Sequence, residues 1–321
     1  MYTDQDLESA IQAGVISDAT VAALRAHVAV GRQMPVADEE HFRLITGFND
    51  VFVVIACALL LASVAWIGRS VWPPLGPFAL AAVAWGLAEY FTRQRRMALP
   101  SIVLMLVFVG AVMVLPDNLA LGSALAAVAA WLHWQRFKVP ITVAAGAAAL
   151  SALAVSGVMA GPLQGQGLEI VVVFFTGVAI FVWALWWDAQ DRPRQTRRAD
   201  VAFWLHLLSA PLIVHPVFAA LGLPKGHIGW WAAVAVLALY AVITLASLAI
   251  DRRALMVSAL AYVLYALSVL LKQYGVISLV FAITALTIGS ALLLLSAFWH
   301  VGRRWVLQAL PTKLRIHLAP V

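Results

Sequence analysis

The residues best suited to chemistry lie in one apolar segment, DVAFWLHLLSAPLIVHPVF, at residues 200–218. It carries His206 near its start and His215 nine positions later, which would be the opposite face of a straight helix. Pro211 and Pro216 lack an amide proton, so we expect them to interrupt the helix and free two backbone carbonyls. Ionisable side chains and interrupted helices in an apolar segment mark candidate substrate or proton sites. The alternative is a kinked helix with two hydrogen-bonded histidines.

His206 is close enough to one end of this segment to exchange protons with water, and Ser209 shares its side of the helix. An unpaired imidazole in lipid is costly, so we expect His206 to face the protein and find a hydroxyl or carbonyl partner. Tyr262 and Tyr265 are the expected side chains. No carboxylate is expected at the depth of the histidines, which leaves a membrane-embedded enzyme with little support.

Two polar stripes follow on the next two apolar segments. At about 100° per residue, each stripe falls on one helix face. The first stripe consists of Tyr240, Thr244, Ser247 and Asp251, and the second of Ser258, Tyr262, Tyr265 and Lys272. The short turn between them makes the two helices antiparallel, so the stripes can meet or line a shared cavity. The alternative is that the hydroxyls bond helix carbonyls and that Asp251 and Lys272 lie at the membrane interface.

No metal and no cofactor are expected. Cys57 is the only cysteine, which excludes an intrachain disulfide and a multi-cysteine metal site. A b-type haem bound by two histidines would need both of them at the same depth, and His133 and His206 fall near the same predicted side. Histidine at the end of a span is, however, more often interfacial. The signatures of nucleotide-binding loops, zinc proteases and serine hydrolases are missing, so ATP-driven transport by this chain alone is not expected.

The elements that hold these residues must be membrane helices. Of the 321 residues, 64% are hydrophobic and only 11% charged, and the mean hydropathy is +0.94. A water-soluble fold cannot cover itself with so little charge. Apolar runs fall at about 51–68, 73–92, 97–115, 119–134, 138–159, 168–187, 200–221, 228–250, 254–271 and 276–299. The sequence therefore predicts an all-α bundle of about ten transmembrane helices.

The loops predict the orientation. Eighteen of the 21 Lys and Arg residues fall in alternate connections and in the two terminal segments, and only Arg69, Lys225 and Lys272 fall on the other side. Positive loops stay in the cytoplasm, so both termini are expected inside, in a bacterial inner membrane. Tryptophans cluster at the same predicted edges, and only Trp85 is deeper. The run GAAALSALAVSG and the spacing of Gly122, Ala126 and Ala130 predict close packing of the fourth and fifth spans.

Three regions are predicted: a cytoplasmic segment at 1–49, the membrane domain at 50–300 and a basic amphipathic tail at 301–321. In the first region Gly14 is expected to end one helix and Ser17 to cap a second, with Val21 on its apolar face. This region has seven acidic and three basic residues, which excludes nucleic acid as a partner. The expected partners are the lipid bilayer and, through residues 1–45, a cytoplasmic protein.

The layout resembles a family of bacterial polytopic membrane proteins of unknown function that begin with a short cytoplasmic helical hairpin. The residues that carry the resemblance are Leu7, Ala10, Ile11, Ala13, Gly14, Ile16, Ser17 and Leu24 at one end and Phe298, Trp299, Gly302 to Arg304, Val306, Leu307, Leu310 and Pro311 at the other. The plan is also similar to that of drug/metabolite-type transporters. No sequence match links residues 51–159 with 168–299 as inverted halves would require.

The leading hypothesis is a secondary transporter or permease-like protein for a small or lipid-like solute. Its candidate binding residues are His206, Ser209, His215, Tyr240, Thr244, Ser247, Tyr262, Tyr265 and Lys272, with Pro211 and Pro216 as hinges. The alternative is a non-catalytic scaffold or sensor that binds a partner through its N-terminal segment. A transporter needs a route for solute through the bundle, whereas a scaffold does not.

Overall fold

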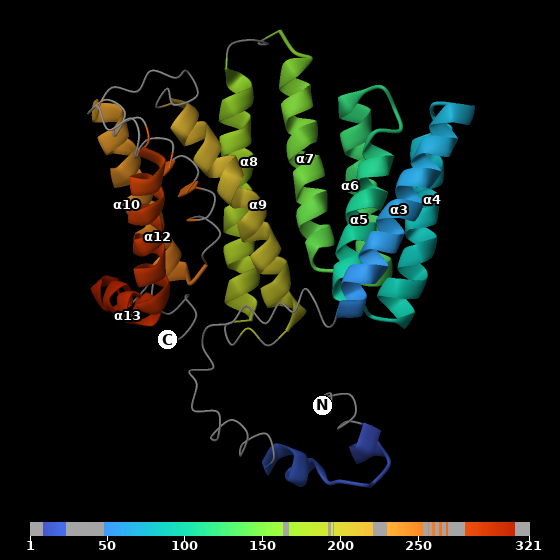
Figure 1. Ribbon diagram of the computed structural model, residues 1–321, viewed down its shortest axis with the longest axis horizontal. Helices are drawn as coiled ribbons and strands as arrows, with labels where there is room; N and C mark the ends of the chain where they lie inside the picture. The colour runs from blue at the N-terminus through green and yellow to red at the C-terminus, as the bar shows by residue number, and fades with distance from the viewer. Residues whose placement is uncertain are drawn as a thin grey trace. The chain divides into compact units, whose positions relative to one another are not determined.

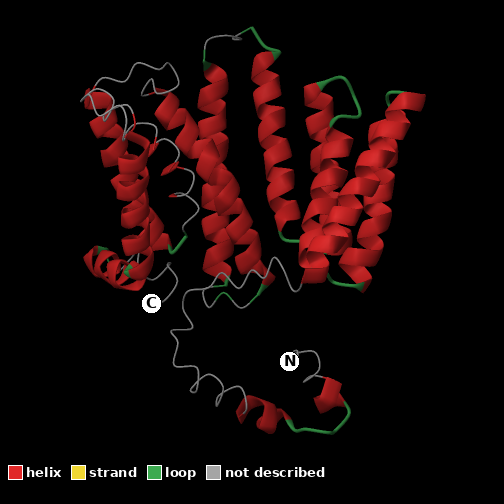
Figure 2. Cartoon of the chain, viewed as in Figure 1, coloured by secondary structure: helices red, strands yellow, loops and turns green. Residues whose placement is uncertain are grey.

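The computed structural model describes residues 9–23, 48–162, 167–191, 194, 196–220, 230–252, 256, 259, 260, 263, 264, 268 and 280–311. It divides the chain into two compact units, Met1–His41 and Phe42–Val321, so the division falls slightly before the predicted boundary at residue 49. Every regular element in the described part is a helix, and no strand occurs there (Figure 2).

In the first unit, two short helices are joined by a turn. Residues 9–12 are helical, and Gly14 follows at a φ of +70°, a left-handed conformation that glycine adopts without a steric cost. The hydroxyl of Ser17 accepts the amide N–H of Thr20 at 3.1 Å, and Val21 is buried on the second helix. The predicted helix end and cap are confirmed.

The second unit is a series of helices that run up and down in the order of the chain (Figure 1). Their bounds are α3 Phe48–Val71, α4 Leu75–Ala88, η1 Glu89–Gln94, α5 Ala98–Met113, α6 Leu119–Phe137, α7 Ile141–Met159, α8 Leu168–Gln190, α9 Arg197–Ala220, α10 Trp230–Ile250, α12 Val280–Ala297 and α13 Trp299–Ala309. The short η1 is a π-helical turn that continues α4. Each predicted apolar run except 254–271 overlaps one of these helices, and most of the run 254–271 lies outside the described residues.

Four of the described helices are long and apolar enough to cross a membrane: Asn49–Val71, Ile141–Met159, Leu168–Gln190 and Arg197–Ala220. In the most apolar stretch of α3 and of α8, only 17% of the residues are buried. Large apolar side chains such as Phe52 and Leu59 on α3 and Phe175 on α8 point outward. Helices that expose their apolar side chains are stable in lipid but not in water, so the fold is that of a membrane protein.

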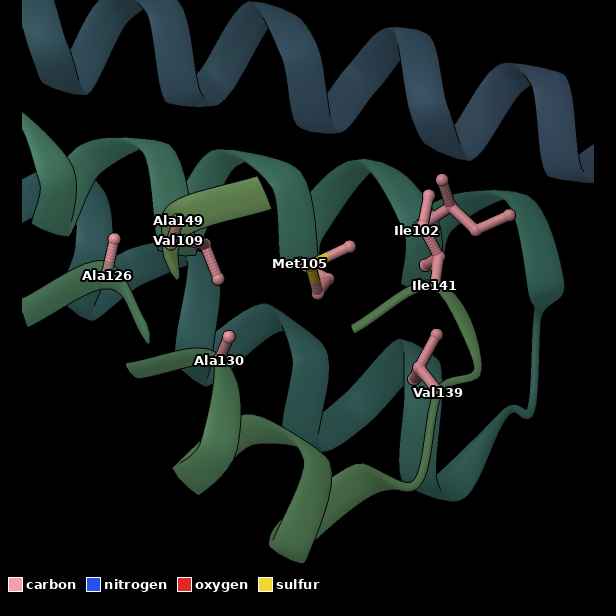
Figure 3. Close-up of a cluster of buried hydrophobic side chains, with 8 residues drawn as sticks. All are labelled: Ile102, Met105, Val109, Ala126, Ala130, Val139, Ile141 and Ala149. Carbon is pink, nitrogen blue, oxygen red and sulfur yellow. The ribbon is translucent and has the colours of Figure 1, made fainter. Parts of the chain in front are cut away.

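Small residues bring α6 and α7 together. Ala126 and Ala130 of α6 are almost completely buried and share a core with Ala149 of α7 and Met105 of α5 (Figure 3). A Cβ placed on Gly146 would lie 3.4 Å from the Cβ of Ala130, which is a close approach for two helices. This confirms the predicted packing, since only small side chains permit it.

Candidate functional site

The most unusual feature of the second unit is a buried cluster of charged side chains where α8, α9 and α10 come together. The carboxylate of Asp188, near the end of α8, accepts two hydrogen bonds from Arg252, at 2.6 Å from Nη2 to Oδ1 and 3.3 Å from Nε to Oδ2. The Nε2 atom of His206 lies 2.9 Å from Oδ2 of the same carboxylate. The side chains of His206 and Arg252 are 1% and 2% exposed, and that of Asp188 is 15% exposed.

A second carboxylate lies one residue before Arg252. Asp251 accepts a hydrogen bond from the Trp299 indole Nε1 at 2.8 Å and one from Arg194 Nη1 at 2.9 Å, and Nη1 of Arg303 is 3.4 Å away. Trp299 and Arg303 belong to α13, and both are 1% exposed. We call the set Asp188, Arg194, His206, Asp251, Arg252, Trp299 and Arg303 the charged network.

The backbone at the end of α10 makes this arrangement possible. Asp251 adopts a positive φ of 60°, which Asp tolerates better than most side chains, and the chain turns there. The turn directs the two neighbouring side chains to different partners. Asp251 binds Trp299 of α13 and Arg194. Arg252 binds Asp188 and, at 3.2 Å from its Nη2 atom, the carbonyl oxygen of Ala199. Arg194 also donates to the carbonyl of Ile250 at 3.1 Å, which satisfies the helix end.

In the described part of the connection between α8 and α9, polar residues form hydrogen bonds with one another. Asp191 is 4% exposed, and its carboxylate accepts hydrogen bonds from the N–H of Thr196 at 2.8 Å and from the hydroxyl of Thr196 at 2.6 Å.

Burial lowers the pKa of the Arg194 guanidinium, and the charge of Arg252 lowers it further, while Asp251 opposes the shift. The ordinary pKa of a guanidinium group is so high that Arg194 stays charged at neutral pH.

The position of His206 is partly as predicted. Its side chain faces the protein and is fully buried, and the ring of Phe181 packs against it at 5.2 Å between centroids. The hydroxyl of Ser209 donates to the His206 carbonyl at 3.0 Å, so the two residues share a side of the helix. The expected lack of a carboxylate was wrong, because the imidazole is hydrogen-bonded to Asp188. The expected partners, Tyr262 and Tyr265, lie outside the described residues.

The rest of α9 departs from the predicted interruption. The helix runs from Arg197 to Ala220 through both Pro211 and Pro216. His215 is exposed whereas His206 is buried, as nine residues of helix require. The two histidines therefore belong to different surroundings, and the structure does not bring His215 to the charged network.

The first polar stripe lies on the inward face of α10. Ser247 is fully buried, Tyr240 and Thr244 are half-buried, and Asp251 is 7% exposed. The hydroxyl of Thr244 donates to the Tyr240 carbonyl at 2.9 Å, which is how a hydroxyl is satisfied within a helix. Asp251 is an acceptor inside the charged network, and its predicted position at the membrane interface stays a prediction. Ser258, Tyr262, Tyr265 and Lys272 lie outside the described residues.

His133, the second histidine considered for haem, has its own partners. Its Nδ1 is 3.2 Å from the Thr142 hydroxyl, and the rings of Trp85, Phe108 and Phe137 surround it. The Nε2 of His206 is already hydrogen-bonded to Asp188, so the geometry does not favour a shared haem. Among the described residues, no three His, Cys, Asp or Glu side chains gather as a metal ion would require.

Sequence reasoning missed Asp188, Arg194, Arg252 and Arg303 as site residues because they were assigned to the connections between spans and to the C-terminal tail. The available signal was the position of Asp188, which directly follows the apolar run AIFVWALWW instead of lying within the polar connection. Comparisons with protein families, with curated proteins and with solved structures found no match to this chain.

Proposed function

We propose that this chain is a multi-pass protein of the bacterial inner membrane, with about ten spans and both ends in the cytoplasm, that acts as a secondary transporter. Its solute would be small or lipid-like. The observation that carries this proposal is the charged network, in which a buried histidine, two carboxylates and three guanidinium groups join four helices.

The energetics of buried charge support a functional reason for this network. Buried ion pairs seldom stabilise a protein more than well-packed apolar side chains would, because each charge must lose its hydration. Ionisable groups that persist at membrane helices commonly mark routes for ions or substrates. The contact of His206 with Asp188 links the imidazole to the Arg252 pairing, because both donors share this carboxylate.

The polar inward face of α10 is the proposed wall of the solute route, and cysteine labelling can test it. Cys57 is the only native cysteine, so Cys57→Ala gives a cysteine-free background. In that background we expect Thr244→Cys to react with a membrane-impermeant thiol reagent in vesicles of either orientation, because a transporter opens its route alternately to both sides. Leu245→Cys is the matched control, since Leu245 is the next residue, is 53% exposed and lies on the outer face.

The outcomes separate the two candidate functions. Labelling of Thr244→Cys from both sides, with Leu245→Cys unlabelled, supports transport. Labelling from one side only, or from neither side, contradicts it. The second candidate, a scaffold or sensor, is favoured by the separate compact unit Met1–His41, which needs no route through the bundle.

A further inference from the structure

A cavity of about 470 Å³ lies away from the charged network, beside the start of α5 and α7. Two chain segments form most of it: residues 92–102, from η1 into α5, and residues 137–141, from α6 into α7. Arg197 and Trp204 of α9 complete the lining. The volume falls in the range of ordinary ligand sites, about 300–1,000 Å³.

The polar part of the lining is strongly cationic. It includes Arg93, Arg96, Lys138 and Arg197, and no carboxylate is among the lining residues. Arg93 is 3.5 Å from Glu89, which is not a lining residue, and Lys138 donates to the Gln135 side chain at 3.1 Å. Neither contact places a negative charge inside the cavity. The electrostatic potential there therefore favours an anion.

Most of the remaining lining is apolar. Ile102 and Ile141 are 8% exposed and belong to one core cluster, in which their side chains lie close together (Figure 3). Phe137 and Trp204 pack against that same cluster. A soluble anion would gain nothing from these groups, whereas hydrocarbon next to an anionic group would fit both parts of the cavity.

The backbone supports the cationic side of the cavity. Arg96 and Lys138 have φ values of +52° and +54°, a left-handed conformation that is uncommon for side chains of their size. Lys138 ends α6 in this conformation, with its N–H bonded to the Trp134 carbonyl. Arg96 follows the π-helical turn η1, an element that occurs frequently at functional sites.

We infer that this cavity binds the headgroup of an anionic phospholipid from the surrounding bilayer, with the first part of its acyl chain on the apolar floor. Guanidinium and ammonium groups are the standard partners of phosphate oxygens. Basic pockets at the cytoplasmic ends of membrane helices hold such headgroups in other proteins, and the charge distribution predicts this end to be cytoplasmic. The inference does not depend on whether the chain transports a solute.

Native mass spectrometry of the full-length protein in neutral detergent tests the inference. We expect phosphatidylglycerol to bind in preference to phosphatidylcholine with the same acyl chains. Lys138→Gln combined with Arg197→Gln should weaken phosphatidylglycerol binding by roughly tenfold or more, since the loss of one charge-assisted contact is worth about that factor. The double variant Arg198→Gln and Arg304→Gln is the charge-matched control, because both of these arginines are exposed and outside the cavity.

Each other outcome overturns the inference. Equal binding of the two lipids removes the role of the headgroup charge. Equal losses in the two double variants indicate general surface attraction. Displacement of the lipid by millimolar inorganic phosphate or glycerol phosphate identifies a soluble anion as the ligand.

Lys138→Gly is a control for misfolding, because it removes the same side chain at a φ that glycine adopts without strain. Weak binding by this variant with an unchanged melting temperature excludes misfolding as the cause.

Discussion

Asp188 receives hydrogen bonds from two side chains that reach it from different parts of the chain. Arg252 binds it with both Nε and Nη2, and His206 approaches the oxygen that Nε also contacts. Because Arg252 is 2% exposed, water cannot replace the carboxylate if it is removed. Removal of the carboxylate would therefore leave the buried charge of Arg252 without this counterion.

Asp188→Asn should lower the stability of the protein by about 3–5 kcal/mol, the usual cost of leaving a buried charge without its counterion. The measurement is the apparent melting temperature in detergent, followed by tryptophan fluorescence. The matched control is Glu89→Gln, which removes a carboxylate that binds Arg136 through two contacts of 2.7 and 3.0 Å at an exposed position. The control should move the melting temperature far less, and equal shifts in the two variants would contradict the argument.

At the scale of elements, α8 and α9 pack side by side with extensive contact (Figure 1). Gly177 of α8 is buried at the contact. A Cβ at this position would lie 2.8 Å from the Cβ of Leu212 and 2.9 Å from its backbone carbonyl carbon. Backbone cannot move aside as a flexible side chain does, so the approach of the two helices requires glycine here.

Gly177→Ala should therefore destabilise the protein by about 1–3 kcal/mol, the range for overpacking a well-filled contact. Gly110→Ala on α5 is the control, because nothing lies within 4 Å of its added Cβ and alanine is the better helix former. We expect a lower melting temperature for the first variant and an unchanged or higher one for the second. An unchanged value for Gly177→Ala would mean that the contact is looser than described.

The elements themselves were more predictable than the contacts between their ends. Hydropathy locates helices because a span needs about 20 apolar residues, and α8 and α10 lie where their runs were expected. Small residues also predicted the α6–α7 packing correctly. The pairing of Asp188 with Arg252 joins residues 64 positions apart, and no periodicity within one helix contains that information. The predicted break at Pro211 and Pro216 was wrong because the helix accommodates both without ending, while their role as hinges stays a prediction.

At the scale of the whole molecule, the predicted topology remains open to a direct test. The connection at residues 161–167 carries no Lys or Arg, and the connection at residues 191–196 begins a strongly basic stretch. We expect alkaline phosphatase to be active when fused after residue 164, on the outer side, and inactive when fused after residue 192. Green fluorescent protein at the same points should give the opposite pattern, and fluorescence at residue 164 would reverse the proposed orientation.

The sequence separations within the charged network also set an order of assembly during synthesis. Asp188 leaves the ribosome 64 residues before Arg252, and Asp251 leaves it 48 residues before Trp299. At a translation rate of about 5–20 residues per second, the first carboxylate is made roughly 3–13 s before its guanidinium partner. Of the two side chains hydrogen-bonded to Asp188, His206, 18 residues away, is made first. The contact between α8 and α9 can thus form before Arg252 is made, and Trp299 of α13 can bind Asp251 only after the 47 residues between them have been made.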